Sequence, residues 1–286
     1  MRIGRLSGRL SILIGDHAID VERASSGRFP ADPDEVFERW NEFVEWAEGT
    51  DAAKARKFEP GELGSPVLRP AQVFAIGLNY RAHAAESGVD TPDAPTVFTK
   101  FRTSLTGPYE PVVLPTAGVD WEAELVAVIG RRAERVPEEE AWSYVAGLTA
   151  GQDLSERAVQ LAGPVPQFSL GKSYPGFAPL GPVLVTPDEF DDPGDLEVSC
   201  SLDDEVLQKG RTSDMVFSVP QLVARLSAVC PLLPGDLIFT GTPPGVGMAR
   251  TPQRYLKPGT TLLTAIEGIG ELRNRLVAGN GYQEPR

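Results

Sequence analysis

The stretch Trp121-Glu-Ala-Glu-Leu-Val-Ala-Val-Ile129 places two acidic residues directly before an apolar run. The run predicts a buried β-strand over Leu125–Gly130. Side chains two residues apart in a strand share one face, with Cα atoms about 6.6–6.8 Å apart, so Glu122 and Glu124 can converge on one hard cation. Paired glutamates at a strand edge can equally face water, because charges are rarely buried. The stretch alone leaves both interpretations open.

A second acidic position follows another predicted strand, which begins at Tyr144 and ends at Asp153. A short helix over Leu154–Gln160 would place Asp153, Arg157 and Gln160 on one helical face. Such a face could bind a cation and an anionic ligand side by side. A capped helix with an exposed Asp–Arg pair is the alternative, and such pairs contribute under about 1 kcal/mol.

A histidine and a glutamate occupy a third segment, Asn79-Tyr-Arg-Ala-His-Ala-Ala-Glu-Ser-Gly88. It predicts a short helix that Asn79 caps and Gly88 ends. His83 and Glu86 are three residues apart, so the carboxylate can hold one ring nitrogen and leave the other as a base near neutral pH. An ordinary His–Glu contact on a helix surface is the other interpretation.

These segments belong to a longer ordered series of motifs. The series is Gly77–Glu86, Val97-Phe-Thr-Lys100, Trp121–Leu125, Gln152–Gln160, Leu170-Gly-Lys-Ser173, Thr212-Ser-Asp-Met215 and Pro234–Pro243. Over residues 70–277 it resembles the fumarylacetoacetate hydrolase superfamily. The tract Pro164–Pro179 is similar to the branch of acylpyruvate and 2,4-diketo-3-deoxy sugar acid hydrolases.

The resemblance implies a fold, a cofactor and a set of site residues. The expected fold is mixed and mostly β, with a β-roll catalytic domain, and the expected assembly is a homodimer. The implied residues are Glu122, Glu124 and Asp153 for Mg²⁺ or Mn²⁺, His83, Glu86 and Lys172 for catalysis, and Arg157, Gln160 and Thr242 for the substrate.

The implied reaction is hydrolysis of the C–C bond of an anionic 2,4-dioxo acid to pyruvate, or a related 2-oxo acid, plus a carboxylic acid. Decarboxylation of oxaloacetate and isomerisation of 2-hydroxyhepta-2,4-diene-1,7-dioate are alternatives within the family. The presence of both His83 and Glu86 favours hydrolysis. A non-enzymatic β protein that only binds a cation is a third, disfavoured interpretation.

The chain divides near residue 66 by its local patterns. Residues 1–66 predict a small α+β domain. It contains a helix over Asp32–Gly49, where apolar residues recur at intervals of three and four residues. Residues 67–286 predict a catalytic domain of short strands, with a helix that starts at a capping box formed by Ser218 and Gln221. Acidic residues at 203 and 204 predict the turn of a hairpin.

Composition excludes several classes of function. The 286 residues carry 27 basic and 40 acidic side chains, and this net charge of −13 disfavours a nucleic-acid partner. The apolar runs are far shorter than the roughly 18 residues of a membrane helix. Two cysteines, Cys200 and Cys230, build no disulfide framework, so we expect free thiols and a cytoplasmic location. Pro166 stands where a phosphate loop ending at Lys172 requires glycine.

Overall fold

The computed structural model describes residues 1–283. Its strands are β1 (Arg2–Leu6), β2 (Arg9–Ile14), β3 (His17–Asp20), β4 (Arg56–Lys57), β5 (Leu63–Gly64), β6 (Val73–Gly77), β7 (Thr96–Thr99), β8 (Leu105–Thr106), β9 (Val112–Leu114), β10 (Val119–Asp120), β11 (Ala123–Ile129), β12 (Val145–Gln152), β13 (Ser155–Glu156), β14 (Ala178–Val185), β15 (Glu197–Leu202), β16 (Glu205–Arg211), β17 (Leu237–Phe239), β18 (Thr261–Ile266) and β19 (Gly270–Ala278). Its α-helices are α1 (Val21–Ala24), α2 (Trp40–Glu48), α3 (Arg81–Glu86), α4 (Arg157–Gln160), α5 (Phe168–Gly171) and α6 (Val219–Ser227). Short 3-10 helices span Pro33–Arg39, Ala52–Lys54, Pro60–Glu62, Arg102–Ser104, Glu138–Tyr144, Pro187–Glu189 and Thr212–Asp214.

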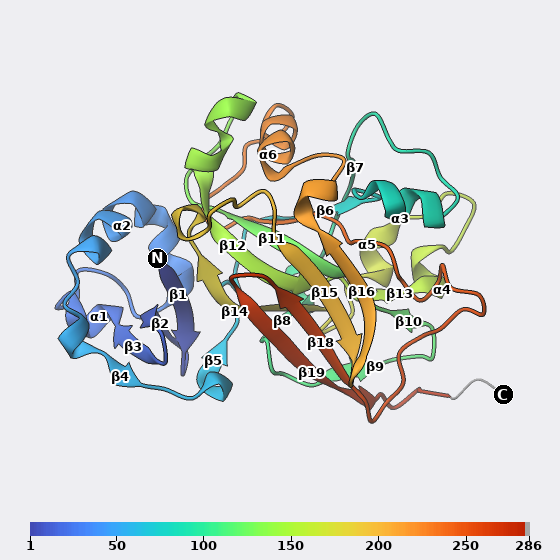
Figure 1. The fold of residues 1–286 in the computed structure, drawn as a ribbon, viewed down its shortest axis with the longest axis horizontal. Coiled ribbons are helices and arrows are strands. Elements are labelled where there is room, and N and C mark those ends of the chain that lie inside the picture. The colour runs from blue at the N-terminus through green and yellow to red at the C-terminus, as the bar shows by residue number, and fades with distance from the viewer. Residues whose placement is uncertain (284–286) are drawn as a thin grey trace.

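The strands form three sheets, drawn in Figure 1. The largest has the order β4-β3-β2-β1-β14-β12-β11-β17-β6-β7, with β5 paired to β1 and β8 paired to β14. A second sheet has the order β16-β15-β18-β19-β9, and β10 pairs with β13. Most pairs are antiparallel, but β17 pairs with β6, β14 with β8 and β19 with β9 in parallel. The prediction of a mixed, mostly β fold is confirmed.

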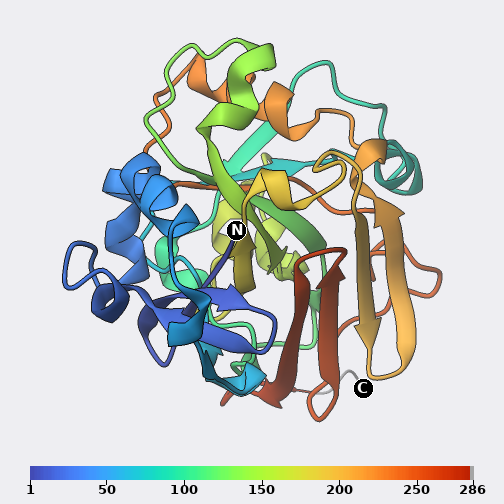
Figure 2. The same cartoon turned by 60° about the vertical axis from the view of Figure 1, so that its left-hand side comes forward.

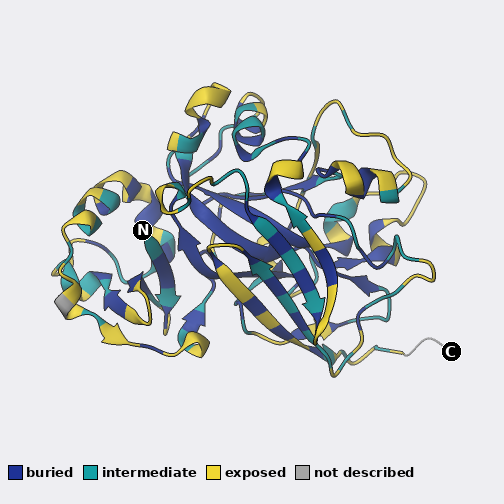
Figure 3. Ribbon diagram, viewed as in Figure 1, coloured by how far each residue is buried: buried dark blue, intermediate teal, exposed yellow. Residues whose placement is uncertain are grey.

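The strand β11 lies in the interior of the largest sheet. Every residue of β11 is buried. Leu125 and Ala127 pack into one hydrophobic core, whereas Val126 and Val128 pack into a second core on the opposite face. A strand covered on both faces has apolar residues at consecutive positions, which explains the continuous apolar run from Leu125 to Ile129. Figure 3 shows the central strands of this sheet in the colour of buried residues.

Residues 1–66 continue this sheet at the side of the molecule drawn in blue in Figure 1. Strand β1 pairs antiparallel with β14, with Ile3 opposite Leu184. In the view of Figure 2, β1 lies near the β18–β19 hairpin, where the guanidinium of Arg2 donates to the carbonyl oxygen of Gly268. The domain boundary near residue 66 stays a prediction.

Two predicted helices differ from the structure in detail. The stretch Asp32–Gly49 forms a 3-10 helix over Pro33–Arg39 followed by α2, and the Asp32 carboxylate accepts a hydrogen bond from the backbone N–H of Asp34 at 3.1 Å. The helix predicted over Leu154–Gln160 was wrong in its first half, because residues 155 and 156 pair with β10 and only α4 is helical.

Other local predictions agree with the structure. Ser218 caps the N-terminus of helix α6, and its side chain and that of Gln221 form the predicted capping box. The hairpin β15–β16 turns at Asp203, which adopts a positive φ of 49°. Strand β19 was not predicted, although its buried residues Leu272 and Leu276 alternate with exposed ones. No helix within residues 1–283 is long and apolar enough to cross a membrane.

Candidate active site

Three carboxylates meet where β11 begins and β12 ends. Antiparallel pairing places Ala123 opposite Gln152. Glu122 and Glu124 flank Ala123, and Asp153 follows Gln152, so the pairing brings the three acidic residues together. All three acidic residues are buried, and one carboxylate oxygen from each lies within 4.8 Å of the others. The pairing of β11 with β12 therefore assembles the predicted metal ligands into one cluster, and the interpretation of Glu122 and Glu124 as a solvated strand edge was wrong.

Two buried lysines neutralise part of this cluster. The Nζ atom of Lys172 lies 2.7 Å from a carboxylate oxygen of Glu122 and 2.7 Å from one of Asp153. Lys100 Nζ lies 2.6 Å from the other oxygen of Asp153 and also donates to the backbone carbonyl of Lys172. Lys100 had no predicted role, because a lysine that follows an edge strand gives no sign in the sequence that it is buried.

The two glutamates differ in their electrostatic environment. Burial alone would raise the pKa of Glu122, but the charges of Lys172, Arg157 and His83 outweigh it and lower this pKa to about 2. Burial raises the pKa of Glu124 well above its usual value, and the neighbouring carboxylates of Asp153 and Glu122 raise it further. Lys172 lowers the pKa of Glu124 only in part, so Glu124 receives less compensation by positive charge than Glu122.

Arg157 lies beside Glu122. The predicted helical face that would join it to Asp153 does not form, because α4 begins only at Arg157. Its guanidinium donates to Asp120 from Nε at 2.9 Å and from Nη2 at 2.7 Å. The remaining terminal nitrogen, Nη1, lies 2.8 Å from the side-chain oxygen of Gln160 and 2.7 Å from Glu122. Arg157 is therefore fully engaged by protein groups, and the substrate-binding roles of Arg157 and Gln160 stay predictions.

The histidine and glutamate of α3 form the expected pair. His83 Nδ1 lies 2.7 Å from Glu86 Oε1, and the side chain of His83 is only 10% exposed. The backbone N–H of Gly245 donates to both oxygens of Glu86, at 3.0 and 2.9 Å. The same loop donates to Glu124 from the backbone N–H of Gly241, so this pair and the carboxylate cluster are joined by one loop. Figure 1 shows α3, α4 and α5 on the side away from residues 1–66.

Asn79 does not cap α3, which begins after Tyr80, so that prediction was wrong. The buried Asn79 side chain instead accepts from the N–H of Phe217 at 2.8 Å. It donates to the carbonyls of Phe217 and Thr240 at 2.9 and 2.7 Å. It thereby ties the start of the helix that carries His83 to two segments distant in sequence.

Thr242 follows β17 and lies against β11. Its hydroxyl donates to the carbonyl of Ala123 at 2.8 Å and accepts from Gln208 Nε2 at 2.8 Å. Gln208 also accepts from the N–H of Ala123 at 3.0 Å, which fixes the backbone between the two glutamates. The predicted contact of Thr242 with substrate stays a prediction.

The carboxylate cluster fits a divalent cation. Its donors are hard oxygens from three buried acidic residues, the ligand type that Mg²⁺ and Mn²⁺ prefer. Within residues 1–283, Glu124 forms no ion pair, and its hydrogen-bond donor is the backbone N–H of Gly241 at 2.7 Å. A cation at the cluster would add the positive charge that Lys172 supplies to Glu124 only in part.

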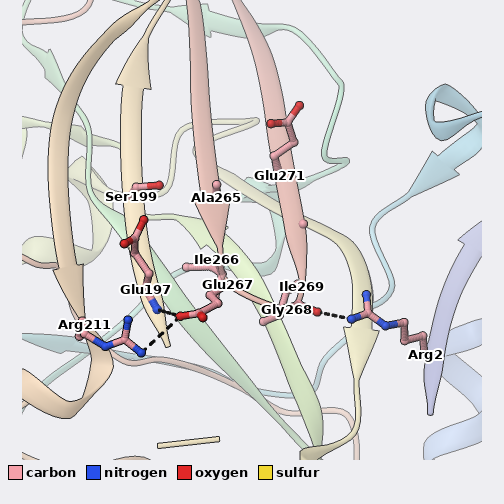
Figure 4. A pocket seen from close by; sticks show the side chains of 11 residues that line it. Arg2, Glu197, Ser199, Arg211, Ala265, Ile266, Glu267, Gly268, Ile269 and Glu271 are labelled. Atoms are coloured by element: carbon pink, nitrogen blue, oxygen red, sulfur yellow. Dashed lines mark hydrogen bonds and ion pairs between the residues drawn. The ribbon is translucent and has the colours of Figure 1, made fainter. Parts of the chain in front are cut away.

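A separate pocket of about 650 Å³ lies between β1 and the second sheet, which has the order β16-β15-β18-β19-β9. Figure 4 shows its lining, which includes Arg2, Glu197, Arg211, Glu267 and Glu271. Arg2 and Arg211 already interact there with Gly268 and Glu267. None of the predicted site residues lines this pocket.

Comparison with known proteins identifies the family. The family model of the fumarylacetoacetate (FAA) hydrolase C-terminal domain matches residues 72–277. The chain belongs to the fumarylacetoacetate hydrolase family. The predicted resemblance is thus confirmed, and the named relatives are hydrolases and isomerases, so the chain is an enzyme of this family.

Two curated family members illustrate the range of activities. Human mitochondrial oxaloacetate tautomerase FAHD2A is 43% identical over 215 residues, which cover 74% of this chain and 68% of the relative. The 2,4-didehydro-3-deoxy-L-rhamnonate hydrolase of Sphingomonas sp. (strain SKA58) is 44% identical over 235 residues, which cover 80% of this chain and 82% of the relative.

Solved structures of family members share the whole fold. A structure described as an HpcE protein from Mycobacterium smegmatis superposes with a TM-score of 0.94 at 50% identity, covering 98% of this chain and 100% of that one. Maleylpyruvate hydrolase from Sphingobium sp. SYK-6, in complex with manganese(II) and pyruvate, superposes with a TM-score of 0.76 at 30% identity and the same coverage.

Proposed function

We propose that this enzyme hydrolyses the C3–C4 bond of a 2,4-dioxo acid, either an acylpyruvate or a diketo-deoxy sugar acid. The pair of His83 and Glu86 beside the carboxylate cluster carries this proposal. Hydrolysis needs a base that activates water, whereas chemistry that only forms an enolate does not. The rhamnonate hydrolase and maleylpyruvate hydrolase relatives support the same reaction class.

Mg²⁺ or Mn²⁺ is the proposed cofactor, with Glu122, Glu124 and Asp153 as its ligands. A bound cation would supply Lewis acidity that polarises the carboxylate and the 2-oxo group of the substrate. The manganese in the maleylpyruvate hydrolase structure supports this assignment. The local cations also explain how a protein with a net charge of −13 accepts an anionic substrate.

His83 is the general base in this proposal. Because Nδ1 donates to Glu86, the lone pair resides on Nε2. Nε2 removes a proton from water, and the water oxygen attacks the C4 carbonyl carbon. The C3–C4 bond then breaks, its electron pair moves to C3 as an enolate, and the proton from His83 is returned to C3. The products are a carboxylic acid and a 2-oxo acid.

Lys172 supplies positive charge where the enolate develops. Its ammonium group lies 2.7 Å from Glu122 and 2.7 Å from Asp153, so its position is fixed before the substrate binds. A charge oriented in advance stabilises a developing anion without reorganisation during the reaction. Arg157, Gln160 and Thr242 are the proposed substrate-binding residues around it.

A second candidate is keto–enol tautomerisation of oxaloacetate, which the 43% identity to the human tautomerase favours. This reaction, decarboxylation of oxaloacetate and isomerisation of an unsaturated diacid would use the same carboxylate cluster and Lys172. None of the three needs an attacking water. They therefore assign no role in water activation to His83.

The deciding experiment is an assay of metal-stripped protein with and without added Mg²⁺ or Mn²⁺. Its substrates are acylpyruvates, a 3-deoxy-2,4-dioxo sugar acid and oxaloacetate. The reaction is measured by the enol absorbance and by the pyruvate released. Metal-dependent cleavage of a dioxo acid is the expected result. Turnover of oxaloacetate alone would contradict hydrolysis. A change of enol absorbance without pyruvate would then indicate tautomerisation, and released pyruvate would indicate decarboxylation.

A cytoplasmic homodimer is the proposed state of the enzyme. The free thiols of Cys200 and Cys230 support a reducing compartment. The edge strand β7 and its flank expose Val97 and Phe101, at 46% and 47%, as apolar surface that a second copy could cover. Light scattering coupled to size exclusion should give twice the chain mass of 30.8 kDa.

A further inference from the structure

The loop from Gly241 to Met248 directs backbone N–H groups at carboxylates of the protein itself. The N–H of Gly241 donates to Glu124 at 2.7 Å, and the N–H of Gly245 donates to both oxygens of Glu86 at 3.0 and 2.9 Å. Glycine-rich loops often hold phosphates in this way. Here the loop instead connects a proposed cation ligand with the carboxylate that orients the base.

A third carboxylate, Asp120, holds the far end of this loop. Asp120 is fully buried and accepts from the N–H of Gly247 at 2.7 Å and from the N–H of Met248 at 2.9 Å. A Cβ atom on Gly247 would overlap the carbonyl oxygen of Arg254 and lie 2.7 Å from an oxygen of Asp120. The close approach of the loop to Asp120 therefore requires glycine at 247.

The same carboxylate fixes Arg157. Two nitrogens of the guanidinium, Nε and Nη2, donate to one oxygen of Asp120 at 2.9 and 2.7 Å. The third nitrogen, Nη1, lies 2.7 Å from Glu122. Asp120 thus shares the charge of Arg157 with Glu122, and it keeps the guanidinium from turning wholly toward the proposed cation ligand.

We propose that Asp120 is a positioning residue. It fixes the position of the Glu86–His83 pair relative to the carboxylate cluster. Asp120 binds the loop that donates to Glu86 from Gly245. Through Arg157, it also orients Glu122. Groups that orient metal ligands and catalytic residues typically change affinity or activity about 10–100-fold when they are mutated. The expected effect on turnover rests on the proposed function. The expected effect on cation binding does not depend on which substrate the enzyme cleaves.

The test is Asp120→Asn, which keeps the shape but removes the charge. The amide introduced at position 120 would turn a donor toward Met248 or Arg157, and the released guanidinium would compete with a cation for Glu122. We expect the Kd for Mn²⁺, measured by electron paramagnetic resonance on the resting protein, to rise about tenfold. We expect kcat for the dioxo acid to fall about tenfold or more.

Asp236→Asn is the matched control. Asp236 is also fully buried, and it accepts from the N–H groups of Gln72 and Leu233 and from the Gln72 side chain. It lies before β17, whereas the loop that contacts Glu86 follows β17. The control should lower the melting temperature and leave the Kd for Mn²⁺ and kcat within about twofold, since its contacts are structural.

Trp121→Phe tests the loop without removing a charge, and it serves even if Asp120→Asn does not fold. It deletes the hydrogen bond from the indole Nε1 to the carbonyl of Gly245, at 3.2 Å. We expect kcat to fall several-fold while the Kd for Mn²⁺ stays unchanged. An unchanged kcat in folded Trp121→Phe would overturn the role of the loop.

Two results would overturn the proposal for Asp120. One is a folded Asp120→Asn protein with the Mn²⁺ affinity of the wild type. The other is an equal loss of Mn²⁺ affinity in Asp236→Asn, which would indicate general destabilisation. If the wild type cleaves no dioxo acid, the proposed function fails, whereas the Mn²⁺ measurements still decide whether Asp120 orients the cation ligands.

Discussion

His83 and Glu86 face each other across one turn of α3, with Nδ1 of the imidazole 2.7 Å from Oε1 of the carboxylate. The same carboxylate accepts the backbone N–H of Gly245 from a loop that is 159 positions away in the sequence. The helix therefore provides the spacing of the pair, and the loop fixes the carboxylate that orients the ring.

Replacing His83 separates hydrolysis from enolate chemistry. His83→Ala should lower kcat for a dioxo acid by about 10²–10⁴, the usual contribution of a general base. Tautomerisation of oxaloacetate should change far less. The control is His17→Ala, because the His17 side chain is 48% exposed and lies outside the site. Steady-state kinetics on both substrates would measure the effect, and dioxo-acid cleavage that survives in His83→Ala would contradict the proposed base.

Neutralising Glu124 should have opposite effects on the metal-free and metal-loaded enzyme. Its pKa is raised by burial and by Asp153 and Glu122, so Glu124→Gln relieves repulsion and should raise the melting temperature of the chelator-treated protein. Added Mn²⁺ stabilises the wild type by mass action and should no longer stabilise the variant.

Thermal unfolding with EDTA and with Mn²⁺ measures both effects of Glu124→Gln. Glu134→Gln, at a side chain that is 53% exposed, should change neither melting temperature. A metal-free Glu124→Gln protein that is less stable than the wild type would show that the repulsion is not significant.

Removing the Asn79 side chain should destabilise the fold. Asn79→Ala leaves the N–H and carbonyl of Phe217 and the carbonyl of Thr240 without their partner. Each buried unpaired group costs about 1–3 kcal/mol, so a loss of roughly 2–5 kcal/mol is expected in urea unfolding. The exposed Asn41→Ala is the control and should cost under about 0.5 kcal/mol. A loss as small as that of the control would refute this role.

The two cysteines should differ in reactivity. Cys200 is buried, and burial raises the pKa of its thiol, whereas Cys230 is only partly buried. Because the thiolate is the reactive form, a chromogenic disulfide reagent should titrate about one thiol in the native enzyme and both in denaturant. Cys230→Ser should abolish the native reaction. Rapid modification of both thiols in the folded wild type would be incompatible with this structure.

Local patterns in the sequence determined much of the fold and the central part of the site. The continuous apolar run of β11 predicted a buried strand, because a strand between two cores has no exposed face. The three-residue spacing of His83 and Glu86 predicted their contact, because helix geometry alone brings such side chains together. The ordered motifs predicted the family that the comparison then established.

Contacts between distant segments decided the rest. No local pattern indicated that Lys100 would reach Asp153, that Asp120 would accept from both Arg157 and the loop at 247, or that Asn79 would bind Phe217 in place of capping its helix. These side chains pair across sheets and loops, and their partners are set by strand order and by burial, which demands a partner for each charge and donor. Periodicity determines which residues form an element, but only the packed structure determines which buried polar groups complete one another.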